Sequence, residues 1–208
     1  MNLNKRYGII LRTYKPRKYK LSLFDEHLGR IECIVPVKKR AFFDKAANGA
    51  LLYYYIKPLQ TVYELHEIEI IDLPSAYARH DIYFLHHILE LYYYFIPSDL
   101  PSIELFDLLK LLFAPSSYLY TKHGKKMFVL KFLSVLGVFP EETVSFSPEM
   151  YRLISLSIDG MLKRTLDAHL EKEIENLICA SIGAHPYKKQ FKTTYFISRT
   201  DYDDSEKR

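Results

Sequence analysis

The chain has 208 residues, of which 49% are hydrophobic and 26% charged, so it can build a packed core and wholesale disorder is excluded. The formal net charge is +4, but residues 1–48 hold twelve Lys or Arg against four Asp or Glu, which makes that segment +8 and the remainder −4. A basic part joined to a mildly acidic one predicts an anionic partner for the N-terminal part. A charge bias that only improves solubility is the alternative.

Apolar residues alternate at positions 9–13, 21–24 and 31–37, separated by a Lys-Pro-Arg-Lys loop and a turn at 25–29. This period of two predicts three β-strands. The ranges 51–57 and 62–72 predict two more, and the longest connection falls between the third and the fourth. Five short strands with that spacing fit an OB-type Greek-key barrel. An SH3-like barrel is the alternative, which periodicity does not distinguish.

Beyond residues 73–75 the apolar period becomes helical. We expect helices at 81–96, 102–113, 125–136, 148–158 and 165–182, with capping residues at several of their ends. The predicted fold is therefore α+β in two parts. An OB-type nucleic-acid-binding domain spans 1–73, an all-α helical domain spans 76–198, and the charged tail 199–208 is expected to be disordered.

The two cysteines, Cys33 and Cys179, lie in apolar patterns and form no Cys-x-x-Cys pair, so neither a disulfide framework nor a cysteine zinc site is indicated. We expect buried thiols in a reducing cytoplasm. The N-terminus lacks the apolar core of a signal peptide, and no apolar run reaches the length of a membrane span. These patterns predict a cytoplasmic protein with no membrane partner.

Motifs for catalysis are absent from the sequence: it has no Gly-rich phosphate loop, no His-Glu-x-x-His and no Gly-x-Ser-x-Gly. His86 and His87 are adjacent on a predicted helix and so point in different directions. The glutamates at 64, 67 and 69 fit the solvated face of the last strand better than a metal cluster. We therefore expect no enzyme activity, no cofactor and no metal, and a metal nuclease is the least favoured function.

Cations gather instead at two connections of the predicted barrel, with tyrosines between them. The candidate nucleic-acid-binding residues are Arg12, Tyr14, Lys15, Arg17, Lys18, Tyr19, Lys20, Lys38, Lys39 and Arg40. Cations together with aromatic rings suit a groove for a single strand, because phosphates pair with the cations and bases stack on the rings. The alternative function is a protein-interaction adaptor whose basic barrel binds an acidic protein surface.

From residue 5 to about residue 197 the chain resembles the RecO family of bacterial recombination mediators. The resemblance is carried, in order, by GIILRTYKPRKYKLSLFDEHLGRIECIV, LLYYYIKPLQTVYELHEIEIID, DIYFLHHILELYYYFIPSDLPSIELFDLLKLLF, KMFVLKFLSVLGVFPE and SIGAHPYKKQFKTTYFI. Many members also hold two Cys-x-x-Cys pairs in the helical domain, which this chain lacks. After the third strand the family's glycine-containing basic loop is replaced by Pro-Val-Lys-Lys-Arg, residues 36–40.

The resemblance implies a function in DNA repair and recombination after DNA damage, in the RecF pathway. It implies binding of single- and double-stranded DNA, annealing of complementary strands, and help in loading recombinase on DNA coated by single-stranded-DNA-binding protein. The implied protein partners are RecR and the acidic C-terminal tail of single-stranded-DNA-binding protein. For that tail we expect an apolar cleft on the helical domain edged by Lys131, Arg152 or Lys163.

Overall fold

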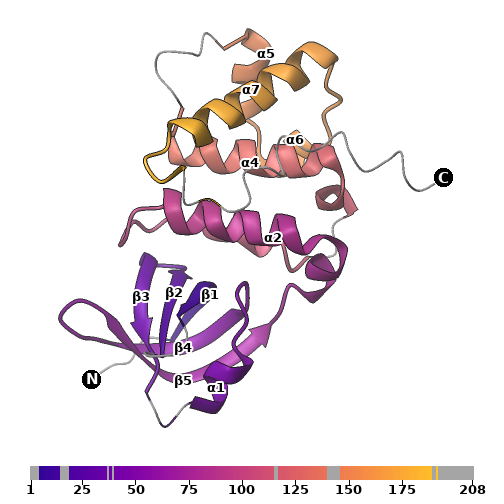
Figure 1. The fold of residues 1–208 in the computed structure, drawn as a ribbon. Coiled ribbons are helices and arrows are strands. Elements are labelled where there is room, and N and C mark those ends of the chain that lie inside the picture. The colour runs from indigo at the N-terminus through magenta and orange to yellow at the C-terminus, as the bar shows by residue number, and fades with distance from the viewer. Residues whose placement is uncertain are drawn as a thin grey trace. The chain divides into compact units, whose positions relative to one another are not determined.

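The computed structural model describes residues 5–14, 19–36, 38, 40–114, 117–139, 146–188 and 191. Of the sequence-predicted features, Lys15, Arg17, Lys18, Lys39 and the tail 199–208 lie outside these ranges. The chain divides into two compact units (Figure 1), one formed by Met1–Arg79 with Ile88–Phe113 and the other by His80–His87 with Ala114–Arg208.

Five strands of the first unit close into a barrel in the order β1-β2-β3-β5-β4. Neighbouring strands are antiparallel except for β3 and β5, which run parallel. This order confirms the predicted OB-type barrel followed by helices. The longest connection holds the short helix α1, Arg40–Lys45. The strands are β1 (Lys5–Tyr14), β2 (Lys20–Asp25), β3 (Gly29–Ile34), β4 (Leu51–Pro58) and β5 (Tyr63–Asp72).

The barrel interior is filled by the apolar residues that alternate along the strands. Leu21, Leu23, Ile31, Cys33, Leu52 and Leu65 are all fully or almost fully buried. One carboxylate shares this interior. Asp25 is fully buried. Its carboxylate accepts a hydrogen bond from the Tyr54 hydroxyl at 2.6 Å and forms an ion pair with Arg6 at 3.1 Å. Its other contacts are with the backbone N–H groups of residues 27 and 28, which shape the turn between β2 and β3.

Helical segments of the same unit cover the outer face of β1 and β2. Phe24 points out of the barrel, and its ring centroid lies 5.3 Å from that of Tyr92 and 6.2 Å from that of Phe106. Tyr92 belongs to α2 (Ser75–Phe95), and Phe106 belongs to α3 (Ile103–Lys110). The closing half of α2 and α3 therefore share an apolar interface with the barrel.

The helix α2 is interrupted at Asp81, whose backbone is not helical. The Asp81 carboxylate accepts a hydrogen bond from the Phe84 N–H at 2.9 Å and pairs with Lys125. It thereby caps the second part of the helix, the part that the apolar pattern predicts to begin at residue 81.

The second unit consists of helices packed around buried Phe128, Phe132, Met150, Met161 and Ile174. Side chains of Thr121, Ser147, Ser157 and Asp167 cap the helix starts. The predicted helix at 148–158 is wrong in its extent, because Ser157 caps a separate helix. The elements are η2 (Ser117–Tyr120), α4 (Lys122–Leu136), α5 (Pro148–Ile154), α6 (Ile158–Leu162) and α7 (Ala168–Ala184). Within the described ranges, no helix has the length and apolar character needed to span a membrane.

Candidate nucleic-acid interface

Two basic connections that are separate in the sequence start from adjacent strand ends. Tyr14 at the end of β1 pairs with Lys20 at the start of β2, and Lys20 pairs with Ile34 at the end of β3. The Val35 N–H donates to the Tyr19 carbonyl at 2.7 Å, which ties the exit of β3 to the entry of β2. The β1–β2 connection and the connection that leads from β3 to α1 therefore leave the barrel side by side.

A third segment joins them after α1. The Asn48 side-chain carbonyl accepts a hydrogen bond from the Thr13 N–H at 3.0 Å, so the turn before β4 contacts the end of β1. We call this region the basic end of the barrel. Its described cationic side chains are Arg12, Lys20, Lys38 and Lys45. Lys15, Arg17, Lys18 and Lys39 belong to the same connections but lie outside the described residues, and Arg40 begins α1 with a side chain that is likewise outside them.

Tyr14 lies at the centre of a cluster of cations and rings. The Arg12 guanidinium lies 5.3 Å from the Tyr14 ring and 5.2 Å from the ring of Tyr93 in α2, and the Lys20 ammonium lies 5.3 Å from Tyr14. The hydroxyls of Tyr14 and Tyr93 are 2.6 Å apart. Partial burial, with this hydrogen bond, raises the pKa of Tyr14, so its phenol stays neutral. Cation–π contacts thus hold Arg12 in place while it remains exposed.

Other cations beside the cluster are engaged within the unit. The Lys20 ammonium pairs with a Glu32 carboxylate oxygen at 3.0 Å. The Arg30 guanidinium donates to the Tyr93 carbonyl at 2.6 Å and to the Ser98 hydroxyl at 2.9 Å. Glu32 therefore compensates the charge of Lys20, whereas Arg30 keeps its charge but has two of its donors bound to neutral protein acceptors. The described cations of the basic end that are exposed are Arg12, Lys38 and Lys45.

The remaining candidate from the sequence, Tyr19, is half-buried and packs against the barrel core. Tyr93 was missed as a site residue, although it contacts Arg12, Tyr14 and Arg30. The only signal in the sequence is the run Tyr-Tyr-Tyr at 92–94, which predicts rings on several faces of a helix. It does not say which strand those rings meet.

A second group of aromatic rings lies on the outer face of β1 and β4. The Tyr53 ring is 5.7 Å from the rings of both Tyr7 and Tyr55, and the Lys5 ammonium lies 4.4 Å from it. On β5 the neighbour of Tyr53 is Glu69, which is exposed. Exposed Glu67 and half-buried Glu64 also lie on β5. This surface carries rings but has an acidic border, which disfavours phosphates.

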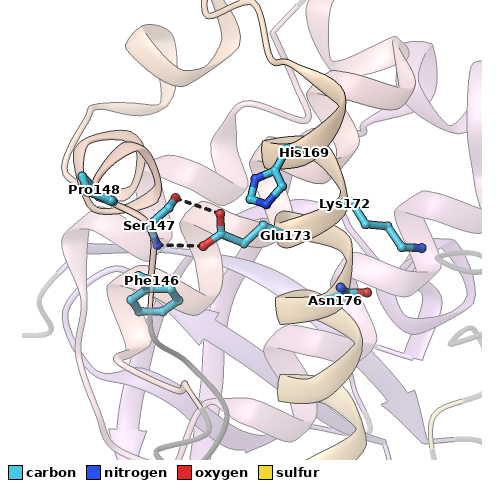
Figure 2. A pocket seen from close by; sticks show the side chains of 7 residues that line it. All are labelled: Phe146, Ser147, Pro148, His169, Lys172, Glu173 and Asn176. Atoms are coloured by element: carbon cyan, nitrogen blue, oxygen red, sulfur yellow. Dashed lines mark hydrogen bonds between the residues drawn. The ribbon is translucent and has the colours of Figure 1, made fainter.

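In the helical unit, a hollow of about 450 Å³ lies between the start of α5 and one side of α7 (Figure 2). The Glu173 carboxylate accepts hydrogen bonds from the Ser147 N–H at 3.0 Å and from the Ser147 hydroxyl at 2.8 Å. His169 and Glu173 face Ser147, whereas Lys172 extends outward and is 70% exposed. Phe146 supplies an apolar wall, and its ring packs edge-on against Tyr151 at 5.2 Å.

The three cations predicted to bind a partner have different environments. Lys131 is half-buried, and its ammonium donates to the Leu156 carbonyl at 3.1 Å. Arg152 is exposed on α5, and Lys163 is exposed at the end of α6. None of them lines the hollow, whose cation is Lys172.

Within the described ranges, no group of three or more His, Cys, Asp or Glu side chains is arranged to hold a metal ion. No protein-family model matches the chain, and no curated protein matches it significantly.

Proposed function

We propose that this protein is a DNA-binding recombination mediator that anneals complementary strands and contacts them through the basic end of its barrel. The observation that carries the proposal is the meeting of two basic connections at adjacent strand ends. In OB-type barrels the connection between the first two strands is a common contact for oligonucleotides. Here that connection holds Lys15, Arg17 and Lys18, and exposed Arg12 precedes it.

The proposed mechanism is electrostatic. Two complementary strands repel each other through their phosphates, and cations that neutralise part of that charge lower the cost of bringing them together. Contacts with phosphates carry no sequence information, so binding is expected to be independent of sequence and strongly weakened by salt. Such a protein needs no catalytic group.

Partners follow from the resemblance to the RecO family, namely RecR and the acidic tail of single-stranded-DNA-binding protein. The hollow beside Phe146 is where we propose that the tail docks, because it joins an apolar wall to Lys172, whose side chain is largely exposed and whose ammonium lies 3.8 Å from a Glu175 carboxylate oxygen. A charge reversal, Lys172→Glu, is expected to abolish binding of a tail peptide. If the variant binds the peptide with unchanged affinity, the tail does not dock in this hollow.

The DNA proposal is tested by the binding of the full chain to a labelled single-stranded oligonucleotide at physiological salt. The triple variant Arg12→Gln, Lys38→Gln and Lys45→Gln is expected to lose most of the affinity. A matched control removes three exposed cations of the helical unit, Lys122→Gln, Arg164→Gln and Lys188→Gln, and is expected to bind as the wild type does.

If the wild type has no measurable affinity for the oligonucleotide, the adaptor function is favoured, in which the barrel binds an acidic protein. Equal losses in the two triple variants would show that net charge matters and the basic end does not. Either result would contradict the proposal.

A further inference from the structure

Three tyrosines of the first unit form a surface that the proposed function leaves unused. Tyr7 on β1 pairs with Tyr53 on β4, and Tyr55 follows Tyr53 on the same side of β4. Their rings lie next to one another, since the Tyr53 ring centroid is 5.7 Å from those of both Tyr7 and Tyr55. We call the surface formed by these three side chains the tyrosine face. All three residues lie within the described ranges of one unit.

The rings of the tyrosine face are held in place and yet reach the solvent. The Tyr53 hydroxyl donates to the Tyr55 hydroxyl at 3.1 Å, and both residues are half-buried. Tyr7 is 39% exposed, and Ile71 on the neighbouring strand β5 is 48% exposed. Tyrosine is enriched at protein interfaces, because its ring is apolar while its hydroxyl can stay hydrated. A group of such rings on adjacent strands indicates an interaction surface.

Carboxylates border the tyrosine face on β5. Glu69 pairs with Tyr53 across the sheet, and Glu67 lies where the register of β4 and β5 shifts between Tyr53 and Tyr55. Glu67 has a φ of 49°, which is unusual for a residue other than glycine, and such bulges redirect side chains. The hydrogen bond with Tyr53 is the main cause of the raised pKa of the Tyr55 phenol, and the charge of Glu67 adds to it. The Glu67 carboxylate therefore lies close to the Tyr55 ring.

These carboxylates lack a compensating cation. Glu64, nearer the start of β5, lies 3.2 Å from the His66 ring nitrogen. Glu67 and Glu69, in contrast, form no ion pair with any cation among the described residues, and both are exposed. The tyrosine face therefore presents uncompensated negative charge directly beside its rings.

The chemistry of this surface favours a cationic ligand. The Lys5 ammonium lies 4.4 Å from the centroid of the Tyr53 ring, which shows that this ring accepts a cation. An arginine guanidinium can stack on a tyrosine ring and at the same time donate to a carboxylate. The phosphates of a nucleic acid are disfavoured, because Glu67 and Glu69 repel them.

The spacing of the rings favours an extended peptide over a small amine. Tyr53 and Tyr55 are alternate residues of one strand, so their Cα atoms lie about 7 Å apart. Alternate side chains of an extended peptide have the same spacing and point to the same side. A peptide with arginine at every second position can therefore place successive guanidinium groups on successive rings, whereas a small amine covers one ring.

The tyrosine face lies far from the basic end of the barrel. Tyr7 is seven residues from Tyr14 along β1, which corresponds to roughly 20 Å of strand. A DNA strand at the basic end therefore leaves the tyrosine face accessible to a second ligand.

We propose that the tyrosine face is the docking site for an extended, arginine-rich segment of a partner protein. Guanidinium groups of that segment stack on the rings of Tyr53 and Tyr55, and the carboxylates of Glu67 and Glu69 compensate their charge. This docking does not depend on the proposed function, because none of these residues belongs to the basic end.

The test measures binding of the full chain to a labelled peptide in which arginine alternates with serine, by fluorescence anisotropy at physiological salt. The wild type is expected to bind this peptide and not a peptide with glutamate in place of arginine. The double variant Glu67→Gln with Glu69→Gln is expected to lose affinity by a factor on the order of ten. Its matched control, Glu149→Gln with Asp159→Asn, removes two exposed carboxylates of the helical unit and is expected to bind as the wild type does.

Variants of the rings separate stacking from general attraction between charges. Tyr53→Leu with Tyr55→Leu keeps apolar side chains but removes the aromatic rings, and it is expected to lose affinity by a similar factor. Tyr53→Phe with Tyr55→Phe keeps the rings and is expected to retain the affinity. Thermal unfolding of each variant shows whether the barrel remains folded.

The outcomes separate this inference from the proposed function. If the wild type does not bind the arginine peptide, the inference is overturned and the proposed function stays intact. Equal losses in the two double carboxylate variants would also overturn it, because the attraction would then come from net charge alone. Loss of affinity for a single-stranded oligonucleotide in Tyr53→Leu with Tyr55→Leu would contradict it as well, because the tyrosine face would then bind DNA.

Discussion

The salt dependence of DNA binding should distinguish cations that contact phosphate from cations that the protein already neutralises. Arg12 and Lys38 are exposed at the basic end, whereas the Lys20 ammonium pairs with Glu32 at 3.0 Å. Two double variants of the full chain separate these two kinds of cation. Arg12→Gln with Lys38→Gln removes two exposed cations, and Lys20→Gln with Glu32→Gln removes a pair without changing the net charge.

The expected magnitude follows from counterion release. Each phosphate contact with a single strand contributes about −0.7 to the slope of log Kobs against log salt concentration. Loss of Arg12 and Lys38 should therefore make the slope shallower by roughly 1.4. Loss of the Lys20–Glu32 pair should change the slope by well under about 0.7, since the pair brings no net charge to the DNA.

The assay is fluorescence anisotropy of a labelled single strand titrated at a series of salt concentrations. Thermal unfolding of each variant checks that the barrel remains folded. Equal slopes in the wild type and in the Arg12–Lys38 variant would refute the assignment of these residues. If the slope changes as much in the Lys20–Glu32 variant as in the Arg12–Lys38 variant, an ion pair within the protein does not keep a cation from contacting phosphate.

Three further predictions concern the stability of the fold. Burial lowers the pKa of His87 from 6.5 to about 4, so the free energy of unfolding should be fully retained above pH 6.5 and fall by roughly 3 kcal/mol as the pH drops to 4; denaturant unfolding at stepped pH measures this. Asp25→Ala leaves the guanidinium of Arg6 without its carboxylate and should destabilise the chain by roughly 3–5 kcal/mol in the same assay. Gly29→Ala should cost more than about 2 kcal/mol by thermal unfolding, because φ is +74° and the added Cβ would lie 2.0 Å from the Leu100 carbonyl oxygen.

Each of these has a control. His87→Gln should show a smaller loss on acidification than the wild type, because only the unfolded wild type gains the proton in that window; identical profiles would contradict the account of His87. Asp25→Ala with less than about 1 kcal/mol of destabilisation would show that the pair does not hold the turn. Gly183→Ala, in helix α7 with no atom within 4 Å of the new Cβ, should stabilise by roughly 0.5–1 kcal/mol.

The barrel was predictable because the interior residues of its strands recur with a period of two and its turns carry glycine or proline. Leu21, Leu23, Ile31 and Cys33 occupy the interior positions that a period of two assigns to them. The order of the strands was also indicated, since the longest connection lies between the third and the fourth. The parallel pairing of β3 with β5 distinguishes this barrel from other small barrels, and it could be seen only in the structure.

The candidate site was less predictable, because a sequence shows that a residue is charged but not whether that charge is compensated. Lys20 and Arg12 were both predicted from the sequence to bind DNA, yet Lys20 pairs with Glu32 whereas Arg12 is exposed. A period of two places Phe24 on the outer face of β2, but the sequence does not show that its ring packs against Tyr92. Such contacts join residues far apart in the chain, and periodicity carries no information on them.

Strand annealing tests most directly whether the basic end brings complementary strands together. Two complementary single strands coated with single-stranded-DNA-binding protein are mixed with the full chain, with and without RecR, and duplex formation is followed in time. We expect faster annealing with the wild type, none beyond background with Arg12→Gln, Lys38→Gln and Lys45→Gln together, and full activity with Lys122→Gln, Arg164→Gln and Lys188→Gln. Annealing by the first triple variant at the wild-type rate would contradict this role of the basic end.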